Sequence, residues 1–302
     1  MTPKPNKGKA SAGRELAQIE DELDSIRKKA YENLSPWQTV QVARHEKRPT
    51  LDDYIDGIFS DFIELHGDRC FGDDHGIMGG FATLKQKRVM VIGHRKGKTV
   101  EENVARNFGM ATPDGYRKAL RLMKLAEKYN LPVVSFIDTP GAYPGLDAEA
   151  RGQAEAIARN LTEMAALEVP IVVVVTGEGG SGGALGIGVG DVVLMLSHSV
   201  YSVISPEGCA AILWHDGSKA PDAAEALRLT ADDLLKFKII DEIIPEPAGG
   251  AHRAQADTLN TVAEALSRHL TRLARVNKRK LVDSRMEKYF KIGRPGPRGR
   301  KA

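Results

Sequence analysis

The chain is poor in the residues that build metal sites and disulfide frameworks. Only two cysteines occur in its 302 residues, Cys70 and Cys209, and they lie far apart in the sequence. No C-x-x-C pair is present, so a thiolate zinc site of the usual spacing is not expected. A disulfide framework is equally unexpected, which indicates a reducing compartment such as the cytoplasm. We therefore predict that this chain itself binds no metal ion.

Long hydrophobic runs and a strong net charge are also missing. The apolar run at 171–175 is too short to cross a bilayer, and residues 1–12 are polar without the apolar stretch of a secretory signal. A net charge of +3 is too small to indicate a polyanionic partner. We therefore expect neither a membrane nor a nucleic acid among the partners. Hydrophobic residues make up 42% of the chain, as in ordinary globular proteins.

The front of the chain has the spacing of helices. Apolar residues recur three and four positions apart along 14–34, which predicts an amphipathic helix. Ser35 followed by Pro36 predicts the N-cap and first residue of a second helix, and we expect a third at 51–65. We assign 1–13 to a disordered N-terminus and 14–79 to a helical extension that contacts a partner.

From about residue 80 the pattern changes to strands that alternate with helices. We expect strands at 81–84, 88–93, 131–137 and 170–175, and helices at 114–129 and 147–167. Strand pairs followed by helices indicate an α/β fold with a parallel sheet covered by helices. We assign 80–275 to this core with its C-terminal helices. The basic segment 276–302 contains Gly and Pro and is predicted to be a flexible tail.

The most informative segment follows the apolar strand at 170–175. Residues 177–183 read Gly-Glu-Gly-Gly-Ser-Gly-Gly, and we interpret five glycines in seven residues as more than helix–strand packing needs. Glycines let the backbone approach a ligand closely. The first N–H groups of a following helix have no intrahelical acceptor and lie at the positive end of its dipole. This turn is therefore predicted to bind negative charge through its amides.

Three motifs overlap in this turn. The match to G-x-G-x-x-G at 177–182 is weak evidence for a dinucleotide site, because the next strand is expected by Asp191 and leaves no room for a full helix. The match to G-x-S-x-G at 179–183 makes Ser181 a candidate nucleophile. A hydrolase would then need a downstream histidine such as His198, His215 or His252, none of which has a recognisable triad context. The third possibility uses the amides alone, as an oxyanion hole in acyl-thioester chemistry.

Several further segments are distinctive when taken together: Gly93–Gly97, Arg106–Met110, Pro113–Met123, Phe136–Gly145, Ala150–Gln153 and Tyr201–Ala210. With the glycine turn, they resemble the carboxyltransferase α subunits of bacterial and plastid-type multisubunit acetyl-CoA carboxylases. The resemblance covers about 14–275. It implies the crotonase-like fold, a spiral of repeated ββα units, with an added N-terminal helical extension.

The resemblance also implies a reaction. Such subunits transfer a carboxyl group from carboxybiotin to acetyl-CoA and form malonyl-CoA, the first committed step of fatty acid synthesis. By this resemblance, the amides of Gly182 and Gly183 hold the urea oxygen of biotin as CO₂ leaves, and no protein base is required. Activity is expected only in a complex. The alternative is a stand-alone acyl-CoA hydratase or hydrolase of this fold, or a serine hydrolase that uses Ser181.

The resemblance names partners and weaker site residues. The partners are a β subunit in an α₂β₂ heterotetramer, the biotin carboxyl carrier protein, the ATP-using biotin carboxylase and acetyl-CoA. Biotin is the cofactor, carried on the carrier protein, and zinc is expected only on the β subunit. Substrate contacts are expected from Gly141, Ala142, Tyr143, Gly179, Gly180 and Ser181. Weaker candidates for contact with CoA or the partner are Arg95, Lys96 and Arg106.

Overall fold

A computed structural model describes residues 7–293; the expectations for 1–6 and 294–302 lie outside this range. The helices are α1 (Lys7–Glu32), α2 (Pro36–Ala43), α3 (Leu51–Ile58), α4 (Val100–Ala105), α5 (Pro113–Lys128), α6 (Leu146–Ala150), α7 (Gln153–Ala166), α8 (Ser181–Leu185), α9 (Pro206–Trp214), α10 (Ala220–Leu227), α11 (Ala231–Lys236), α12 (Gln255–Leu273) and α13 (Lys278–Lys291). The strands are β1 (Ser60–Glu64), β2 (Ile77–Leu84), β3 (Lys87–His94), β4 (Val133–Thr139), β5 (Ile171–Gly180), β6 (Val192–Leu196), β7 (Val200–Ser202) and β8 (Glu242–Ile244).

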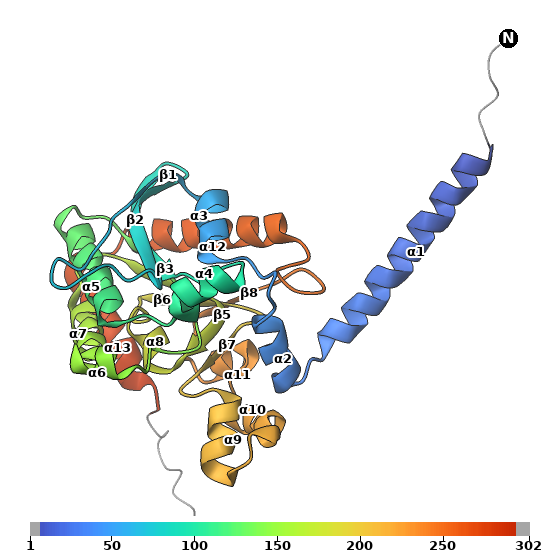
Figure 1. Cartoon of the computed structure of the whole chain (residues 1–302). Helices are drawn as coiled ribbons and strands as arrows, with labels where there is room; N and C mark the ends of the chain where they lie inside the picture. Colours follow the sequence, from blue (N-terminus) through green and yellow to red (C-terminus); the bar gives the residue numbers. More distant parts are fainter. Residues whose placement is uncertain (1–6, 294–302) are drawn as a thin grey trace, which may run out of the picture.

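One sheet organises the body of the molecule (Figure 1). Its strand order is β1-β2-β3-β4-β5-β6-β8, and β7 pairs with the far end of β5. The first three strands are antiparallel, and β3 through β8 are parallel. Strand β5 pairs with β6 at its start and with β7 at its end, and its last residues belong to the glycine-rich segment.

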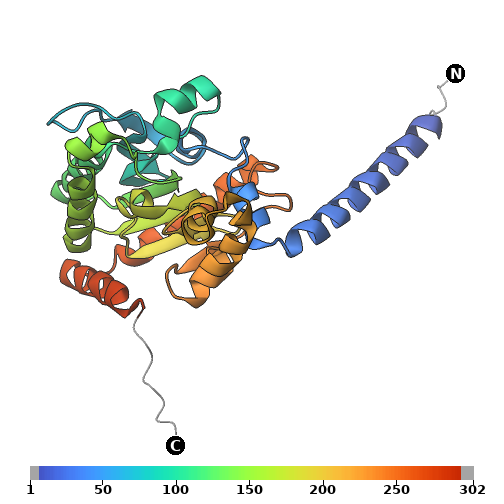
Figure 2. The ribbon, with the colours of Figure 1, turned by 60° about the horizontal axis from the view of Figure 1, so that its bottom comes forward.

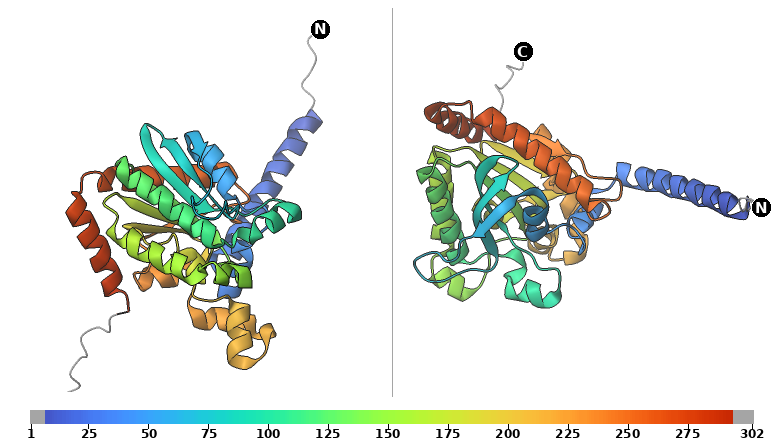
Figure 3. Two further views of the ribbon diagram at one scale, coloured as in Figure 1. Left: turned by 60° about the vertical axis from the view of Figure 1, so that its left-hand side comes forward. Right: turned by 90° about the horizontal axis from the view of Figure 1, so that it is seen from above.

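Helices cover both faces of the sheet, as the parallel pattern predicts (Figures 1 and 3). Successive β5 side chains point to opposite faces: Val173 packs with α5 and α7, and Val174 packs with α3 and α12. Both valines are fully buried. The near-continuous apolar run of β5 is therefore explained by burial on two sides.

The N-terminal region differs from the expectation in two ways. Helix α1 already includes Lys7–Gly13, part of the segment predicted to be disordered, and it extends away from the body (Figures 1 and 2). The helix expected at 51–65 was too long. Helix α3 ends at Ile58 because Phe59 is extended, and β1 then pairs with the edge of β2.

The single helix predicted at 147–167 is two helices. Gly152 adopts φ +85°, a left-handed conformation that glycine takes easily, and it separates α6 from α7. On either side of this break, Arg151 pairs with Asp114 of α5, and the Gln153 side chain donates to the Ala111 carbonyl just before α5.

The C-terminal segment was predicted to be a flexible tail, and this is wrong for 278–291. These residues form α13, which packs beside α7 through a fully buried arginine (Figures 2 and 3). Arg285 donates to the carbonyls of Met164, Leu167 and Val169 and forms an ion pair with Asp191 at 2.8 Å. The basic composition suggested a solvated segment, but the buried charge of Arg285 holds this segment against the body of the protein.

Candidate active site

The glycines of 177–183 lie in the end of β5 and the start of α8. Four of the five have no room for a side chain. A Cβ would lie 2.4 Å from Asp138 at Gly177, 2.7 Å from Tyr201 at Gly179, 2.1 Å from the Pro140 carbonyl at Gly180 and 2.3 Å from the Gly141 carbonyl carbon at Gly183. Close packing therefore explains these four glycines, contrary to the interpretation made from the sequence.

Gly182 is the exception. Its φ is not in the left-handed region, and a Cβ there would meet only Ile157, at 3.7 Å. Neither packing nor backbone conformation therefore requires glycine at this position. An open position of this kind allows another molecule to approach the backbone closely.

Helix α8 presents two free amides. The N–H groups of the first turn have no acceptor inside a helix, and neither Gly182 nor Gly183 donates to another group within residues 7–293. Gly182 is half-buried, whereas Gly183 is buried against the backbone of Gly141 and Ala142. The preceding residue, Ser181, has φ +50°, an uncommon conformation for serine.

A pocket of about 410 Å³ opens beside Gly182. It is lined by Ser181, Gly182, Leu185, Gly188, Val193, Tyr201, Ser202, Val203, Leu234, Ile239, Tyr289 and Ile292. None of these side chains carries a charge. Burial raises the pKa of Tyr289 to about 12, and it also raises that of Tyr201, so both are neutral phenols near pH 7. The pocket therefore suits an apolar group with an uncharged polar end.

Sequence reasoning missed most of this lining. Of the predicted site residues, only Ser181 and Gly182 line the pocket. Tyr289 and Ile292 come from the segment that was expected to be a tail. Tyr289 is held in place because its hydroxyl accepts a hydrogen bond from the Gly190 amide at 2.9 Å. The only available signal was the spacing of Leu281, Arg285 and Tyr289 on one helical face.

Gly141, Ala142 and Tyr143, which were predicted to contact substrate, lie on the other side of α8. The backbone of Gly141 and Ala142 packs against Gly183, and the Thr139 hydroxyl donates to the Gly141 carbonyl at 2.7 Å. The Tyr143 carbonyl accepts from Gln153 at 2.9 Å. These residues pack against the glycine turn at Gly183, and they do not line the pocket beside Gly182.

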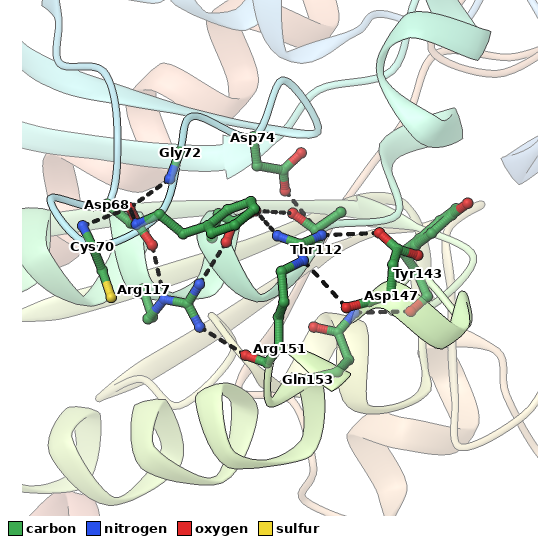
Figure 4. Close-up of polar contacts among 12 residues, drawn as sticks. Asp68, Cys70, Gly72, Asp74, Thr112, Arg117, Tyr143, Asp147, Arg151 and Gln153 are labelled. Atoms are coloured by element: carbon green, nitrogen blue, oxygen red, sulfur yellow. Dashed lines mark hydrogen bonds and ion pairs between the residues drawn. The ribbon is translucent and has the colours of Figure 1, made fainter. Parts of the chain in front are cut away.

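A polar network extends this support to the loop before β2 (Figure 4). Arg117 of α5 donates to Asp68 at 2.8 Å and to the Arg151 carbonyl at 3.1 Å. Burial opposes ionisation of Asp68, but the Arg117 guanidinium and three backbone amides outweigh it and lower the pKa of this carboxyl to about 2. Asp74 accepts from the Thr112 amide at 2.9 Å. The network joins the loop to the first turn of α5 and to the α6–α7 junction.

Charged residues lie beneath the end of β5. The Lys96 ammonium contacts Asp138 at 2.7 Å and Glu178 at 3.2 Å. Arg44 of α2 contacts the other oxygen of Glu178 at 2.6 Å and also pairs with Glu207. Burial opposes both charges, but the oppositely charged neighbours outweigh it. The pKa of Glu178 is therefore lowered, and the pKa of Lys96 is raised. This cluster fixes the strand end that leads into the glycines.

The other two predicted cations are also paired. Arg95 contacts Asp52 at 2.7 Å, and Arg106 contacts the same carboxylate at 3.2 Å and the Lys96 carbonyl at 2.9 Å. Contact with CoA or a partner subunit stays a prediction for all three cations. Such contact would use the N–H groups that these ion pairs leave free.

Among residues 7–293, Ser181 has none of the hydrogen-bond partners of a hydrolase nucleophile. Within the described residues no histidine is hydrogen-bonded to its hydroxyl, and no group of three or more His, Cys, Asp or Glu is arranged to hold a metal ion.

No helix in the described part of the chain has both the length and the apolar character needed to cross a membrane.

The architecture and this site define a crotonase-like carboxyltransferase fold. The chain resembles the transcarboxylase 12S core with methylmalonyl-CoA bound, at a TM-score of 0.57 and 21% identity, over 73% of this chain and 43% of that one. It also resembles a chain of a Pseudomonas malonate decarboxylase hetero-tetramer in complex with coenzyme A, at a TM-score of 0.57 and 15% identity, over 72% of this chain and 86% of that one. At these identities the likeness concerns the fold.

Sequence relatives are much more similar. The acetyl-coenzyme A carboxylase carboxyl transferase subunit alpha of Geobacter metallireducens is 60% identical over 280 residues, which cover 93% of this chain and 88% of the relative. The same subunit of Halalkalibacterium halodurans is 57% identical, with coverages of 92% and 86%. The model of the family "Acetyl co-enzyme A carboxylase carboxyltransferase-like" matches residues 3–293. The chain therefore belongs to the acetyl-CoA carboxylase carboxyltransferase family, and the resemblance stated from the sequence is confirmed.

Proposed function

We propose that this chain is the α half of a carboxyltransferase that moves a carboxyl group from carboxybiotin to acetyl-CoA and forms malonyl-CoA for fatty acid synthesis. In this role the amides of Gly182 and Gly183 donate hydrogen bonds to the urea oxygen of biotin. Two oriented donors at an oxygen that gains negative charge contribute several kcal/mol to catalysis, typically about 3–4 kcal/mol for one donor.

The observation that carries this proposal is the room at Gly182. Four neighbouring glycines are explained by packing, but this one is not. Its amide is free, its surface is accessible, and it borders the uncharged pocket. A ligand that presents a polar oxygen to the backbone would occupy the space of the missing side chain.

The pocket fits biotin in chemical character. Biotin has an apolar body and a urea group with one carbonyl oxygen, and the pocket combines apolar walls with the free Gly182 amide at its edge. When bound, carboxybiotin supplies the transferable carboxyl group. The residues of this chain bind and orient it: Gly182 and Gly183 donate to the oxygen, and Leu185, Val203 and Tyr289 cover the apolar body.

No residue of the pocket is needed as a general base. The lining has no Asp, Glu, His or Lys, so this half of the site acts through its amides. The β subunit, which would hold the acetyl-CoA thioester, completes the site in an α₂β₂ heterotetramer. Biotin carboxyl carrier protein and ATP-using biotin carboxylase supply the donor in the cytoplasm, and zinc belongs to the β subunit.

The N-terminal extension is proposed to contact a partner. Helix α1 projects from the body, and its apolar residues Ile19, Leu23 and Ile26 are more than half exposed (Figure 1). A chain that starts at Leu51 would not test this cleanly, because it would also remove Arg48, whose guanidinium is buried against Glu246. A chain that starts at Ser35 removes α1 alone. Its normal assembly with the β subunit would refute the proposal.

The decisive experiment uses the reverse reaction. Purified chain, alone and with its β subunit, is mixed with malonyl-CoA and free biotin, and acetyl-CoA formation is measured. We expect turnover only when both subunits are present, and we expect Gly182→Val to abolish most of it, because a branched side chain would fill the open space beside this backbone amide. Turnover by the chain alone would favour a stand-alone acyl-CoA enzyme instead. Normal activity of Gly182→Val would remove the amide role.

A further inference from the structure

Helix α7 carries an asparagine in the middle of its buried face. Ala156 and Met164, one turn before and one turn after it, are apolar and buried, and Asn160 is itself only 1% exposed. An amide at such a position costs free energy unless its donors find acceptors. The Asn160 side chain donates to the Tyr116 carbonyl at 3.0 Å and to the Gly186 carbonyl at 2.9 Å. It therefore joins α5, α7 and the end of α8.

The contact with Gly186 leads directly to the candidate amides. Gly186 follows the last residue of α8, so its carbonyl has no donor within that helix. Its own N–H donates to the Gly182 carbonyl at 2.9 Å. That carbonyl and the Gly183 N–H belong to one planar peptide unit. The direction of the Gly183 N–H is therefore linked to Gly186, and Gly186 is held by Asn160.

Tyr116 strengthens the same connection. Its ring lies against Gly186, where a Cβ would be 2.5 Å from the ring, and its hydroxyl lies 3.4 Å from the Gly183 carbonyl. Asn160 binds the backbone of Tyr116 and the carbonyl of Gly186 at once. One buried amide thus fixes the distance between the tyrosine and the short helix.

We propose that Asn160 is a positioning residue for carboxyl transfer, which orients the amides of α8 through Gly186 and Tyr116 without touching the substrate. The inference rests on the proposed function of Gly182 and Gly183 and adds a determinant of their geometry. A shift of about 1 Å in a group that acts on the reacting atoms lowers rates by about 100-fold. Loss of both donors at Asn160 is expected to lower kcat by about 10- to 100-fold.

The test compares two variants of similar size in the complex with the β subunit. Asn160→Asp replaces the two N–H donors by a carboxyl group, and Asn160→Leu removes both donors without adding a titratable group. For each, kcat and KM for free biotin are measured with malonyl-CoA, below the unfolding temperature. We expect kcat to fall in both variants while KM changes less than about threefold, because the pocket walls are untouched.

A matched control removes a buried polar group elsewhere. Thr258 is fully buried in α12, on the other face of the sheet, and donates to the Ala254 carbonyl at 3.1 Å. Thr258→Val is expected to keep the wild-type kcat. Should Asn160→Asp fail to fold, Asn160→Leu decides: a wild-type kcat in this folded variant overturns the positioning role alone. A wild-type complex that transfers no carboxyl group overturns both this role and the proposed function.

Discussion

Substitution of the two neighbouring glycines of α8, Gly182 and Gly183, should have different effects on stability although both substitutions lower activity. A methyl group at Gly183 would lie 2.3 Å from the Gly141 carbonyl carbon and 2.5 Å from the Ala142 nitrogen. Ordinary contact begins at 3.4 Å, so the backbone must move by about 1 Å. At Gly182 the nearest atom is the end of Ile157, at 3.7 Å, and no movement is needed.

These distances predict different effects on folding. Gly183→Ala is expected to lower the free energy of unfolding by about 1–3 kcal/mol, the usual range for overpacking. Gly182→Ala is expected to leave it unchanged or to raise it by up to about 1 kcal/mol, because alanine favours a helix over glycine. Urea unfolding of the two variants and the wild type measures both differences.

Both variants should lose catalytic activity. Gly183→Ala displaces an amide by about 1 Å, for which a loss of about 100-fold in kcat is expected. Gly182→Ala places a methyl group where the ligand would approach, and we expect a loss of at least about 10-fold, measured with malonyl-CoA and free biotin in the complex. A Gly182→Ala enzyme with wild-type activity would refute the reasoning, since nothing would then approach that backbone.

Three further outcomes are expected. Ser181→Ala should keep carboxyl transfer within a few-fold of the wild type; a loss of nearly all activity would indicate an acyl-enzyme instead. Glu246→Ala leaves the buried Arg48 without its partner and should lower the free energy of unfolding by about 3–5 kcal/mol in urea titrations; a loss below about 1 kcal/mol would contradict this. Burial lowers the pKa of His94 to about 3, whereas in the unfolded chain it is about 6.5. Between these values the unfolded state binds one more proton than the folded state. The free energy of unfolding should therefore fall as pH drops below about 6.5, by up to about 1.4 kcal/mol per pH unit. His94→Gln should flatten that slope between pH 6.5 and 4.5, and an unchanged slope would show that another group is responsible.

Periodicity predicted most elements of the core correctly. The parallel strands and the helices that cover them follow from local patterns, since a strand buried on both faces must be apolar throughout. Two errors depend on features that the pattern does not contain. The break at Gly152 depends on a left-handed residue, and the end of α3 at Ile58 depends on strand pairing with β2.

The site was predicted less completely than the fold. The turn at 177–183 was recognisable, but the reason for its glycines was not, because Asp138, Pro140 and Gly141 approach from a distant part of the sequence. The pocket wall from α13 was missed for a similar reason. A basic segment is usually solvated, and only the three-dimensional arrangement shows that Arg285 reaches three carbonyls.

The anchoring of α13 has a consequence for how the protein is made. The carbonyls of Met164, Leu167 and Val169 and the carboxylate of Asp191 gain their arginine donor only after residue 285 has been synthesised. A nascent chain therefore lacks this donor until residue 285 emerges, and domains generally begin to fold from the N-terminal side during synthesis. A prematurely terminated chain would retain the glycine turn but would lack both the arginine and the wall that Tyr289 and Ile292 form. Synthesis past residue 292 is thus a condition for a complete pocket beside Gly182.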